Sequence, residues 1–282
     1  MIIGISGKIE SGKDTVGKII QYLLWTKGDL TEKDIITLDS SGQVNHNVII
    51  QSGFKIKKFA DKLKDIVCIL LGCTKEQLED KEFKEKELGE EWWKWKVVCN
   101  EGDLDIIYQD YYFSSKDEAE EFHNNDSETR WKPELIKITP RKLLQLLGTE
   151  AGREIIHPNI WCNALFSDYK EEWVDSGDSV AEEDVSKILK EPNWIITDVR
   201  FPNEAQAIKD RGGIVIRVNR PLGPHNLKYN DDGTTDFKGS LHPSETALDD
   251  WTFDYAIDNN GTIEELISNV KNLLEKWKIL KQ

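Results

Sequence analysis

Residues 1–15 read MIIGISGKIESGKDT, and this stretch decides the fold of the 282-residue chain. Its first six residues are an apolar run typical of a buried parallel strand, and they lead directly into a glycine loop. Residues 15–25 follow with helical spacing, and one face of that helix collects Val16, Ile19, Ile20, Leu23 and Leu24. A strand, a glycine loop and a helix in this order are the context that a phosphate-binding loop requires.

The glycine loop nearly matches the pattern G-x-x-x-x-G-K-S/T, in which backbone N–H groups surround a phosphate. Gly7, Gly12 and Lys13 have the required spacing, but Asp14 stands where the pattern has a hydroxyl, and Thr15 comes one position late. Because Mg²⁺ accepts carboxylates and keeps several waters, Asp14 and Thr15 are both candidate metal ligands. A glycine turn without any ligand is the alternative, and the position directly after an N-terminal strand favours a functional loop.

Apolar runs and helical patterns alternate along the rest of the chain. We expect strands at residues 54–60, 193–200, 214–220 and 253–259, and helices at residues 60–72, 139–155, 157–173, 202–213 and 262–280. A capping box at Thr74 predicts a further short helix. The alternation predicts a three-layer α/β fold, in which helices cover both faces of an open, mostly parallel sheet.

We expect a single domain over residues 1–282 with two elaborations. Residues 79–132 are densely charged and contain clustered tryptophans, and we interpret them as a small mixed insertion. Residues 28–52 are a polar excursion. Residues 221–243 are rich in Gly, Pro, Asp and Asn, which predicts a mobile, lid-like segment.

Composition excludes several classes of function. A net charge of -15 argues against a non-specific binder of nucleic acid polymers, which would present a basic surface. No apolar run is long enough to span a membrane, and no secretory signal is evident at the N-terminus. The four cysteines are scattered without zinc-site spacing, which is typical of reduced thiols in a cytoplasmic protein.

A second group of polar residues lies in TPRKLLQLLGTEAGR, residues 139–153. Arg141, Gln145 and the Gly148–Thr149 pair fall near one helical face, with Lys142 beside them. The leucines of the stretch already supply a core face. Glycine within a good helix costs about 1 kcal/mol, which is unexpected unless something must approach closely. A solvated helix face is the alternative.

A third group follows the predicted strand at residues 193–200. Asp198 ends this strand, at the edge where open α/β sheets bind ligands. A carboxylate there can orient Mg²⁺ or accept a substrate hydrogen, and Arg200 can bind phosphate. Capping of the next turn by Asp198 is the alternative. Arg217 and Arg220 flank residues 221–243, where they either stabilise charge on a transferred phosphoryl group or lie on the surface.

Together these motifs resemble the deoxynucleoside monophosphate kinases of large DNA phages, a branch of the P-loop nucleoside monophosphate kinase superfamily. The matching stretches run in order from the first strand to the last helix. They are SGKIESGKDT (6–15), FADKLK (59–64), TPRKLLQLLGTE (139–150), Pro158-x-x-Trp161, ITDVRFPNEA (196–205), HPSE (242–245) and DNNGTIEEL (258–266).

The resemblance implies transfer of a phosphoryl group from ATP, with Mg²⁺, to a deoxynucleoside monophosphate (dNMP), which gives a diphosphate (dNDP) and ADP. It implies that GKDT is the family's own form of the loop. The residues that would hold ATP and Mg²⁺ are Gly7, Lys8, Ser11, Gly12, Lys13, Asp14 and Thr15. Those on the deoxynucleotide side would be Arg141, Lys142, Gln145, Gly148, Thr149 and Trp161, completed by Asp198, Arg200 and Glu204.

Among these, the residues expected to act in catalysis are Lys13, Arg141, Lys142, Asp198 and Arg200. The resemblance further implies a homodimer, and the cytoplasm of a bacterial host if the chain is phage-encoded. Two alternatives stay open: another P-loop small-molecule kinase, such as a dephospho-coenzyme A kinase, and a non-catalytic nucleotide-dependent switch. The stretch 139–150 favours the dNMP branch, and a switch would leave its basic residues without a role.

Overall fold

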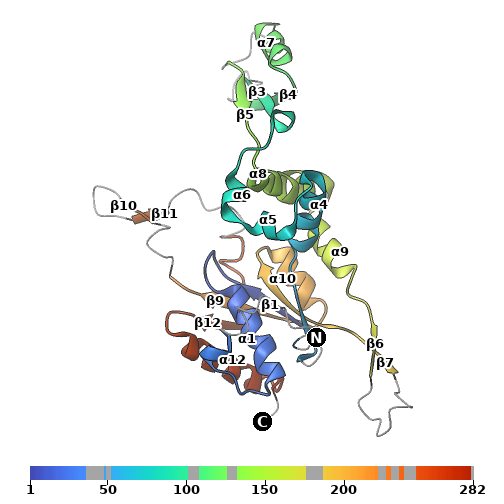
Figure 1. Ribbon diagram of the computed structural model, residues 1–282, viewed down its shortest axis with the longest axis vertical. Coiled ribbons are helices and arrows are strands. Elements are labelled where there is room, and N and C mark those ends of the chain that lie inside the picture. The colour runs from blue at the N-terminus through green and yellow to red at the C-terminus, as the bar shows by residue number, and fades with distance from the viewer. Residues whose placement is uncertain are drawn as a thin grey trace. The chain divides into compact units, whose positions relative to one another are not determined.

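The computed structural model describes residues 1–35, 48, 52–100, 108–125, 132–175, 187–221, 227–229, 235–237 and 246–280. The chain forms two compact units (Figure 1). Unit 1 contains Met1–Lys62 and Asn159–Gln282, and unit 2 contains Leu63–Pro158. The predicted insertion at 79–132 therefore lies inside unit 2, which extends beyond it at both ends.

Unit 1 is built on a five-stranded parallel sheet. Its strands are β1 (Ile2–Ser6), β2 (Phe54–Lys57), β8 (Asn193–Val199), β9 (Ile214–Asn219) and β12 (Tyr255–Asp258). Their order is β12-β9-β1-β8-β2. β1 lies in the centre because it is apolar on both faces, and every one of its residues is buried. The loop after β1 therefore emerges between the β9–β12 half and the β8–β2 half of the sheet.

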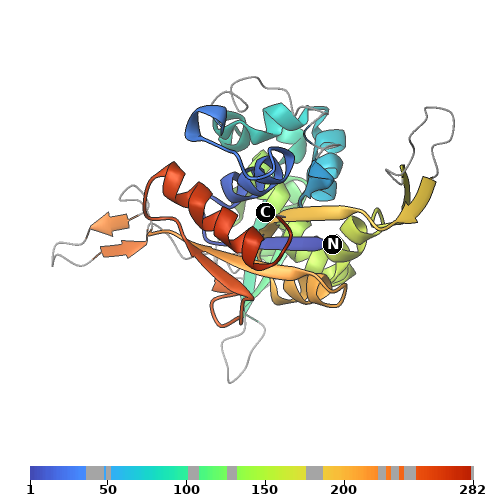
Figure 2. The same cartoon turned by 90° about the horizontal axis from the view of Figure 1, so that it is seen from below.

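Helices cover both faces of this sheet (Figure 2). On one face, α1 (Lys13–Trp25) and α12 (Ile263–Lys276) form a core with Ile3 and Ile5. On the other face, α9 (Ile160–Phe166) and α10 (Pro202–Lys209) form a second core with Ile2 and Trp194. Successive residues of β1 thus reach opposite layers. The predicted three-layer α/β fold is confirmed.

Unit 2 carries the predicted insertion and the stretch 139–155. Up to residue 125, its helical elements are α4 (Asp61–Leu71), which crosses the unit boundary in sequence, α5 (Lys75–Glu79), α6 (Lys81–Glu85), η1 (Glu90–Trp92) and α7 (Lys116–Asn125). An antiparallel sheet of order β4-β3-β5 contains β3 (Lys94–Asn100), β4 (Tyr108–Phe113) and β5 (Glu134–Ile136). The predicted capping box at Thr74 is confirmed at the start of α5.

The stretch 139–155 begins as expected but changes its winding. Thr139 caps α8 (Pro140–Gln145), and Pro140 occupies its first turn. From Leu146 to Ile156 the helix continues as a π-helix, η2, which no sequence pattern indicated. Gly148 lies in this segment, where an added Cβ would be 2.9 Å from Leu63 Cδ2. Close packing thus explains the glycine, and π-helical turns are frequent at functional sites.

The predicted helix at 157–173 is wrong at both ends. His157 is extended because it precedes Pro158, so α9 begins only at Ile160. Beyond α9, β6 (Glu172–Asp175) pairs antiparallel with β7 (Lys187–Lys190). Trp173, Val174 and Ile188 favour a strand, and this pairing takes the place of the C-terminal part of the predicted helix.

Parts of two predictions lie outside the described residues. Within the lid-like segment 221–243, the structure describes position 221 and an antiparallel pair, β10 (Leu227–Tyr229) and β11 (Thr235–Phe237). The HPSE stretch at 242–245 and most of the excursion at 28–52 also fall outside. Among the described residues, no helix combines the length and the apolar character that crossing a membrane requires.

Candidate functional site

The glycine loop, Gly7–Gly12, connects the end of β1 to the first turn of α1. Gly12 has φ +90°, a backbone conformation that favours glycine. An added Cβ on Gly12 would lie 2.5 Å from Asn259 Nδ2. At Gly7 an added Cβ would collide with Ser11 Oγ and lie 2.6 Å from the Val218 carbonyl oxygen. The two glycines of the motif are therefore required by the course of the chain itself.

The loop presents a charge and an unpaired donor. Lys13 Nζ donates a hydrogen bond of 2.7 Å to the Lys8 carbonyl, so the ammonium group lies across the loop. Ser11 is 1% exposed, and its hydroxyl has no hydrogen-bond partner among the described residues. Leaving such a group unpaired costs about 1–3 kcal/mol, which a bound oxygen would offset. The donors, the ammonium group and the N-terminus of α1 together suit a phosphate.

Asn259, directly after β12, supports the loop. Its Nδ2 donates 2.9 Å to the Ser11 carbonyl, and its backbone N–H donates 2.8 Å to the Asn219 carbonyl. The side chain is buried. Sequence reasoning did not identify this residue, although it lies in the DNNGTIEEL stretch. The loop is therefore held by a residue far along the chain as well as by its own strand and helix.

Replacing Asn259 by alanine is expected to lower the free energy of unfolding by about 1–3 kcal/mol, because the Ser11 carbonyl loses its buried partner. Urea denaturation would measure the change. Asn260→Ala is the matched control, since Asn260 is exposed, and its expected change is within about 0.5 kcal/mol. Equal losses in the two variants would contradict the support role of Asn259.

Asp14 is held by two groups that sequence reasoning did not identify. Its Oδ1 accepts a hydrogen bond of 2.6 Å from Thr197 Oγ1 in β8, and Lys58 Nζ lies 2.8 Å from the same oxygen. Partial burial by itself raises the pKa of Asp14, but hydrogen bonds from Lys58 and Thr197 and the charges of Lys58 and Lys13 bring that pKa below its usual value. Asp14 is therefore an ionised carboxylate, the kind of ligand that Mg²⁺ accepts.

Asp198 at the end of β8 holds the turn that follows β2. Its two carboxylate oxygens accept hydrogen bonds of 2.8 Å from the Phe59 N–H and 3.0 Å from the Ala60 N–H. Burial raises the pKa of Asp198, although these two bonds oppose the change. These bonds also explain why β2 ends at Lys57 rather than at residue 60. Asp198 thus caps a turn, and its role toward metal or substrate stays a prediction.

Glu204 is almost fully buried at the start of α10. Its Oε2 accepts hydrogen bonds from the backbone N–H groups of Arg200, at 2.7 Å, and Phe201, at 3.1 Å. This arrangement favours a structural role in which Glu204 fixes the backbone of Arg200. Trp161 is buried in α9, 5% exposed. Contact of Glu204 and Trp161 with a substrate stays a prediction.

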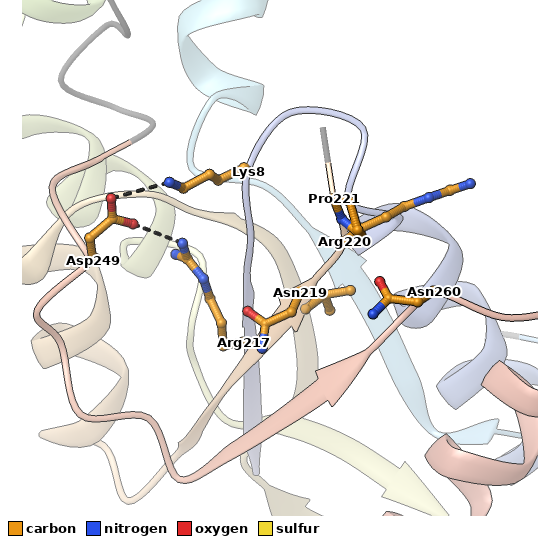
Figure 3. Close-up of a pocket in the computed structure, with 8 residues that line it drawn as sticks. Lys8, Arg217, Asn219, Arg220, Pro221, Asp249 and Asn260 are labelled. Carbon is orange, nitrogen blue, oxygen red and sulfur yellow. Dashed lines mark hydrogen bonds and ion pairs between the residues drawn. The ribbon is translucent and has the colours of Figure 1, made fainter. Parts of the chain in front are cut away.

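A cavity of about 510 Å³ opens beside the glycine loop, on the β9–β12 side (Figure 3). Lys8 and Arg217 converge on Asp249 at 3.3 Å and 2.9 Å, as Figure 3 shows. Arg217 also donates 3.3 Å to Ser6 Oγ at the end of β1. Arg220 and Asn260 line the same cavity. Both arginines identified in the sequence therefore reach this cavity, where their positive charge suits an anionic ligand.

The remaining predicted residues belong to unit 2, and they are Arg141, Lys142, Gln145, Gly148 and Thr149. Arg141 forms an ion pair with Glu85. Lys142 Nζ lies 3.8 Å from Glu150 Oε1, whose other carboxylate oxygen is buried without a partner among the described residues. The predicted site residues thus fall into one group in unit 1 and one group in unit 2.

Comparison with known proteins gives one consistent result. The model of a protein family described as deoxynucleotide monophosphate kinase matches residues 1–270. The deoxynucleoside-5'-monophosphate kinase of Escherichia phage T5 is 25% identical over 224 residues, which cover 74% of this chain and 72% of the relative. A putative deoxynucleotide monophosphate kinase of Acanthamoeba polyphaga mimivirus is 30% identical over 181 residues, 62% and 76% of the two chains. The deoxynucleotide monophosphate kinase of Enterobacteria phage T4 is 27% identical over 151 residues, 54% and 48%.

Proposed function

The chain belongs to the deoxynucleotide monophosphate kinase family, and we propose that it transfers the γ-phosphoryl group of ATP to the phosphate of a dNMP, giving dNDP and ADP. It is a phosphotransferase that acts on small molecules. The observation that carries the assignment of its donor site is the glycine loop, where Gly7 and Gly12 allow the tight course of the backbone, Lys13 supplies charge and the Ser11 hydroxyl lacks a partner among the described residues.

We assign the β- and γ-phosphates of ATP to this loop and the rest of the donor nucleotide to the cavity lined by Lys8, Arg217 and Arg220. The loop N–H groups and the Lys13 ammonium group bind the phosphates, and the arginines add positive charge beside them. The volume of about 510 Å³ lies within the range of small-molecule pockets, roughly 300–1,000 Å³.

Asp14 and Thr15 fit a magnesium ion, since both are oxygen ligands directly after Lys13. When bound there, Mg²⁺ would supply positive charge that neutralises the phosphates of ATP. We propose Asp14 as the main ligand, either directly or through water, because its carboxylate is ionised and the hydrogen bond from Thr197 orients it. Thr15 remains the alternative ligand.

We assign the acceptor to the residues that the sequence analysis places on the deoxynucleotide side. Arg141, Lys142 and Arg200 bind the phosphate of the dNMP, and the rest of the group is Gln145, Gly148, Thr149 and Trp161. Within unit 1, Asp198 fixes the backbone at Phe59 and Ala60, and Glu204 fixes the backbone of Arg200. Transfer then depends on positioning and charge neutralisation, and no strong base is needed because the acceptor phosphate is already anionic.

The two alternatives are not favoured, because the family match extends over residues 1–270. Neither a dephospho-coenzyme A kinase nor a non-catalytic switch accounts for that match. We also propose a homodimer that acts in the cytoplasm of its host and binds no nucleic acid polymer. Analytical ultracentrifugation would test the dimer.

A screen of acceptors tests the proposed function. The wild-type chain is incubated with ATP, Mg²⁺ and each common dNMP or NMP in turn, and the products are separated by anion exchange. We expect at least one dNMP to yield its diphosphate and ADP in equal amounts. Release of inorganic phosphate without any diphosphate, or no turnover with any acceptor, would contradict the assignment. The same screen gives the base preference and the discrimination between deoxyribose and ribose.

A further inference from the structure

Lys58 lies directly after β2, at the same edge of the parallel sheet as the glycine loop. The backbone of this turn is fixed by carboxylates. The Lys58 N–H donates 3.0 Å to Asp61 Oδ2, and the next two N–H groups are held by Asp198. The Lys58 side chain therefore starts from a preorganised backbone, which is what a reacting site requires of its residues.

Its neighbours in the same segment pair elsewhere. Lys55 Nζ lies 2.7 Å from Glu172, Lys62 Nζ lies 2.9 Å from Asp168, and Lys57 Nζ lies 5.2 Å from the centre of the Trp194 ring. Of these four lysines, Lys58 is the one that reaches Asp14, at 2.8 Å, next to Lys13. The other three lysines fit a charged surface segment that serves solubility. Such a role does not explain why Lys58 points toward Asp14.

The ion pair of Lys58 with Asp14 is suited to exchange. The Asp14 side chain is 60% exposed and that of Lys58 is 30% exposed, and exposed pairs of this kind contribute about 0–1 kcal/mol. Asp14 keeps the hydrogen bond of Thr197 on the same oxygen when Lys58 moves away. A phosphoryl oxygen offers the ammonium group at least as much negative charge as the carboxylate.

We propose that Lys58 is a further catalytic residue, which leaves Asp14 and binds a non-bridging oxygen of the transferred phosphoryl group. The sheet order places Lys58 on the β8–β2 side of the loop, whereas the cavity of Figure 3 lies on the β9–β12 side. This inference rests on the proposed function. The bond from the γ-phosphorus to the β,γ-bridging oxygen breaks and its electrons stay on ADP, while an oxygen of the acceptor phosphate bonds to that phosphorus. Lys58 keeps its protons and stabilises the charge.

Kinetics of Lys58→Ala and Lys58→Arg test this role. We expect Lys58→Ala to lower kcat at least ~100-fold with KM values for ATP and dNMP within ~3-fold, the pattern of an interaction made in the transition state. Lys58→Arg keeps the charge, and its kcat should exceed that of the alanine variant at least ~10-fold. The matched control is Lys55→Ala in the same segment, where kcat should stay within ~2-fold of wild type.

Equilibrium binding gives a second readout without turnover. The probe is adenosine joined to a deoxynucleoside through five phosphates, which occupies donor and acceptor sites together. We expect Lys58→Ala to weaken binding of this probe at least ~10-fold while its ATP affinity stays within ~3-fold. Unchanged kcat and probe affinity in a folded Lys58→Ala chain would overturn the role of Lys58 and leave the proposed function standing.

Two further outcomes are informative. If the wild-type chain phosphorylates no dNMP, the proposed function fails and the role of Lys58 fails with it. If Lys58→Ala does not fold, Lys58→Met keeps the aliphatic length and carries the same expectations. Loss of the fold in both variants would overturn the role, because a weak, exchangeable ion pair is its premise.

Discussion

Replacing Lys13 by alanine is expected to lower the turnover of dNMP at least ~100-fold, the range found when a positioned charge is removed from a transition state. Such a loss equals about 2.7 kcal/mol of transition-state stabilisation. The ammonium group lies across the loop, 2.7 Å from the Lys8 carbonyl oxygen. Water that enters the vacated space cannot replace its charge.

A coupled assay of ADP formation with dTMP and dGMP would measure the effect of Lys13→Ala. Lys18→Ala, further along α1, is the matched control and should retain near-normal turnover. Thermal unfolding of both variants checks that the fold is kept. Near-normal turnover in a folded Lys13→Ala chain would contradict the assignment of the glycine loop as the donor phosphate site.

Replacing Arg141 by alanine is the second change with a large expected effect, again at least ~100-fold on turnover. Arg141 forms an ion pair with Glu85, and both side chains are about half exposed. An exposed pair contributes only about 0–1 kcal/mol, so the fold should be almost unaffected. The expected loss of turnover therefore reflects the missing positive charge of Arg141 beside the acceptor phosphate, and not a loss of folding stability.

The control for Arg141→Ala is Lys137→Ala. Lys137 pairs with Glu87 at 2.8 Å in the same unit, and its side chain is similarly exposed. Initial rates over a range of dNMP concentrations give kcat and KM separately. A rise in KM alone would show an interaction made equally in the ground state and the transition state, whereas a fall in kcat shows a contact made in the transition state. Turnover near the wild-type rate in Arg141→Ala would contradict the assignment of Arg141 to the acceptor site.

Local signals explain why most of unit 1 could be predicted. The apolar run of β1, the glycines after it and the periodicity of α1 are all contained in residues 1–25. In unit 2, the capping box at Thr74 likewise marks a helix start within a few residues. The helix predicted at 157–173 forms only as α9, because His157 is extended before Pro158 and Glu172–Asp175 pairs as a strand with β7.

The partners in the candidate site could not be predicted, because they are distant in sequence. Asn259 meets Ser11 across 248 positions, and Thr197 meets Asp14 across 183 positions. These contacts depend on the strand order, which alternating patterns do not specify. Glu204 was identified in a motif and expected on the substrate side. It is instead buried and accepts a hydrogen bond from the backbone N–H of Arg200. The π-helical winding of Leu146–Ile156 likewise has no local signal.

Following a radiolabelled phosphoryl group tests the central claim most directly. ATP labelled in its γ-phosphoryl group is incubated with Mg²⁺, a dNMP and the wild-type chain, and the products are separated. We predict that the label appears in the β-phosphate of dNDP and that Lys13→Ala abolishes this transfer. Label released only as inorganic phosphate, or retained entirely in ATP with every dNMP, would contradict phosphoryl transfer by this chain.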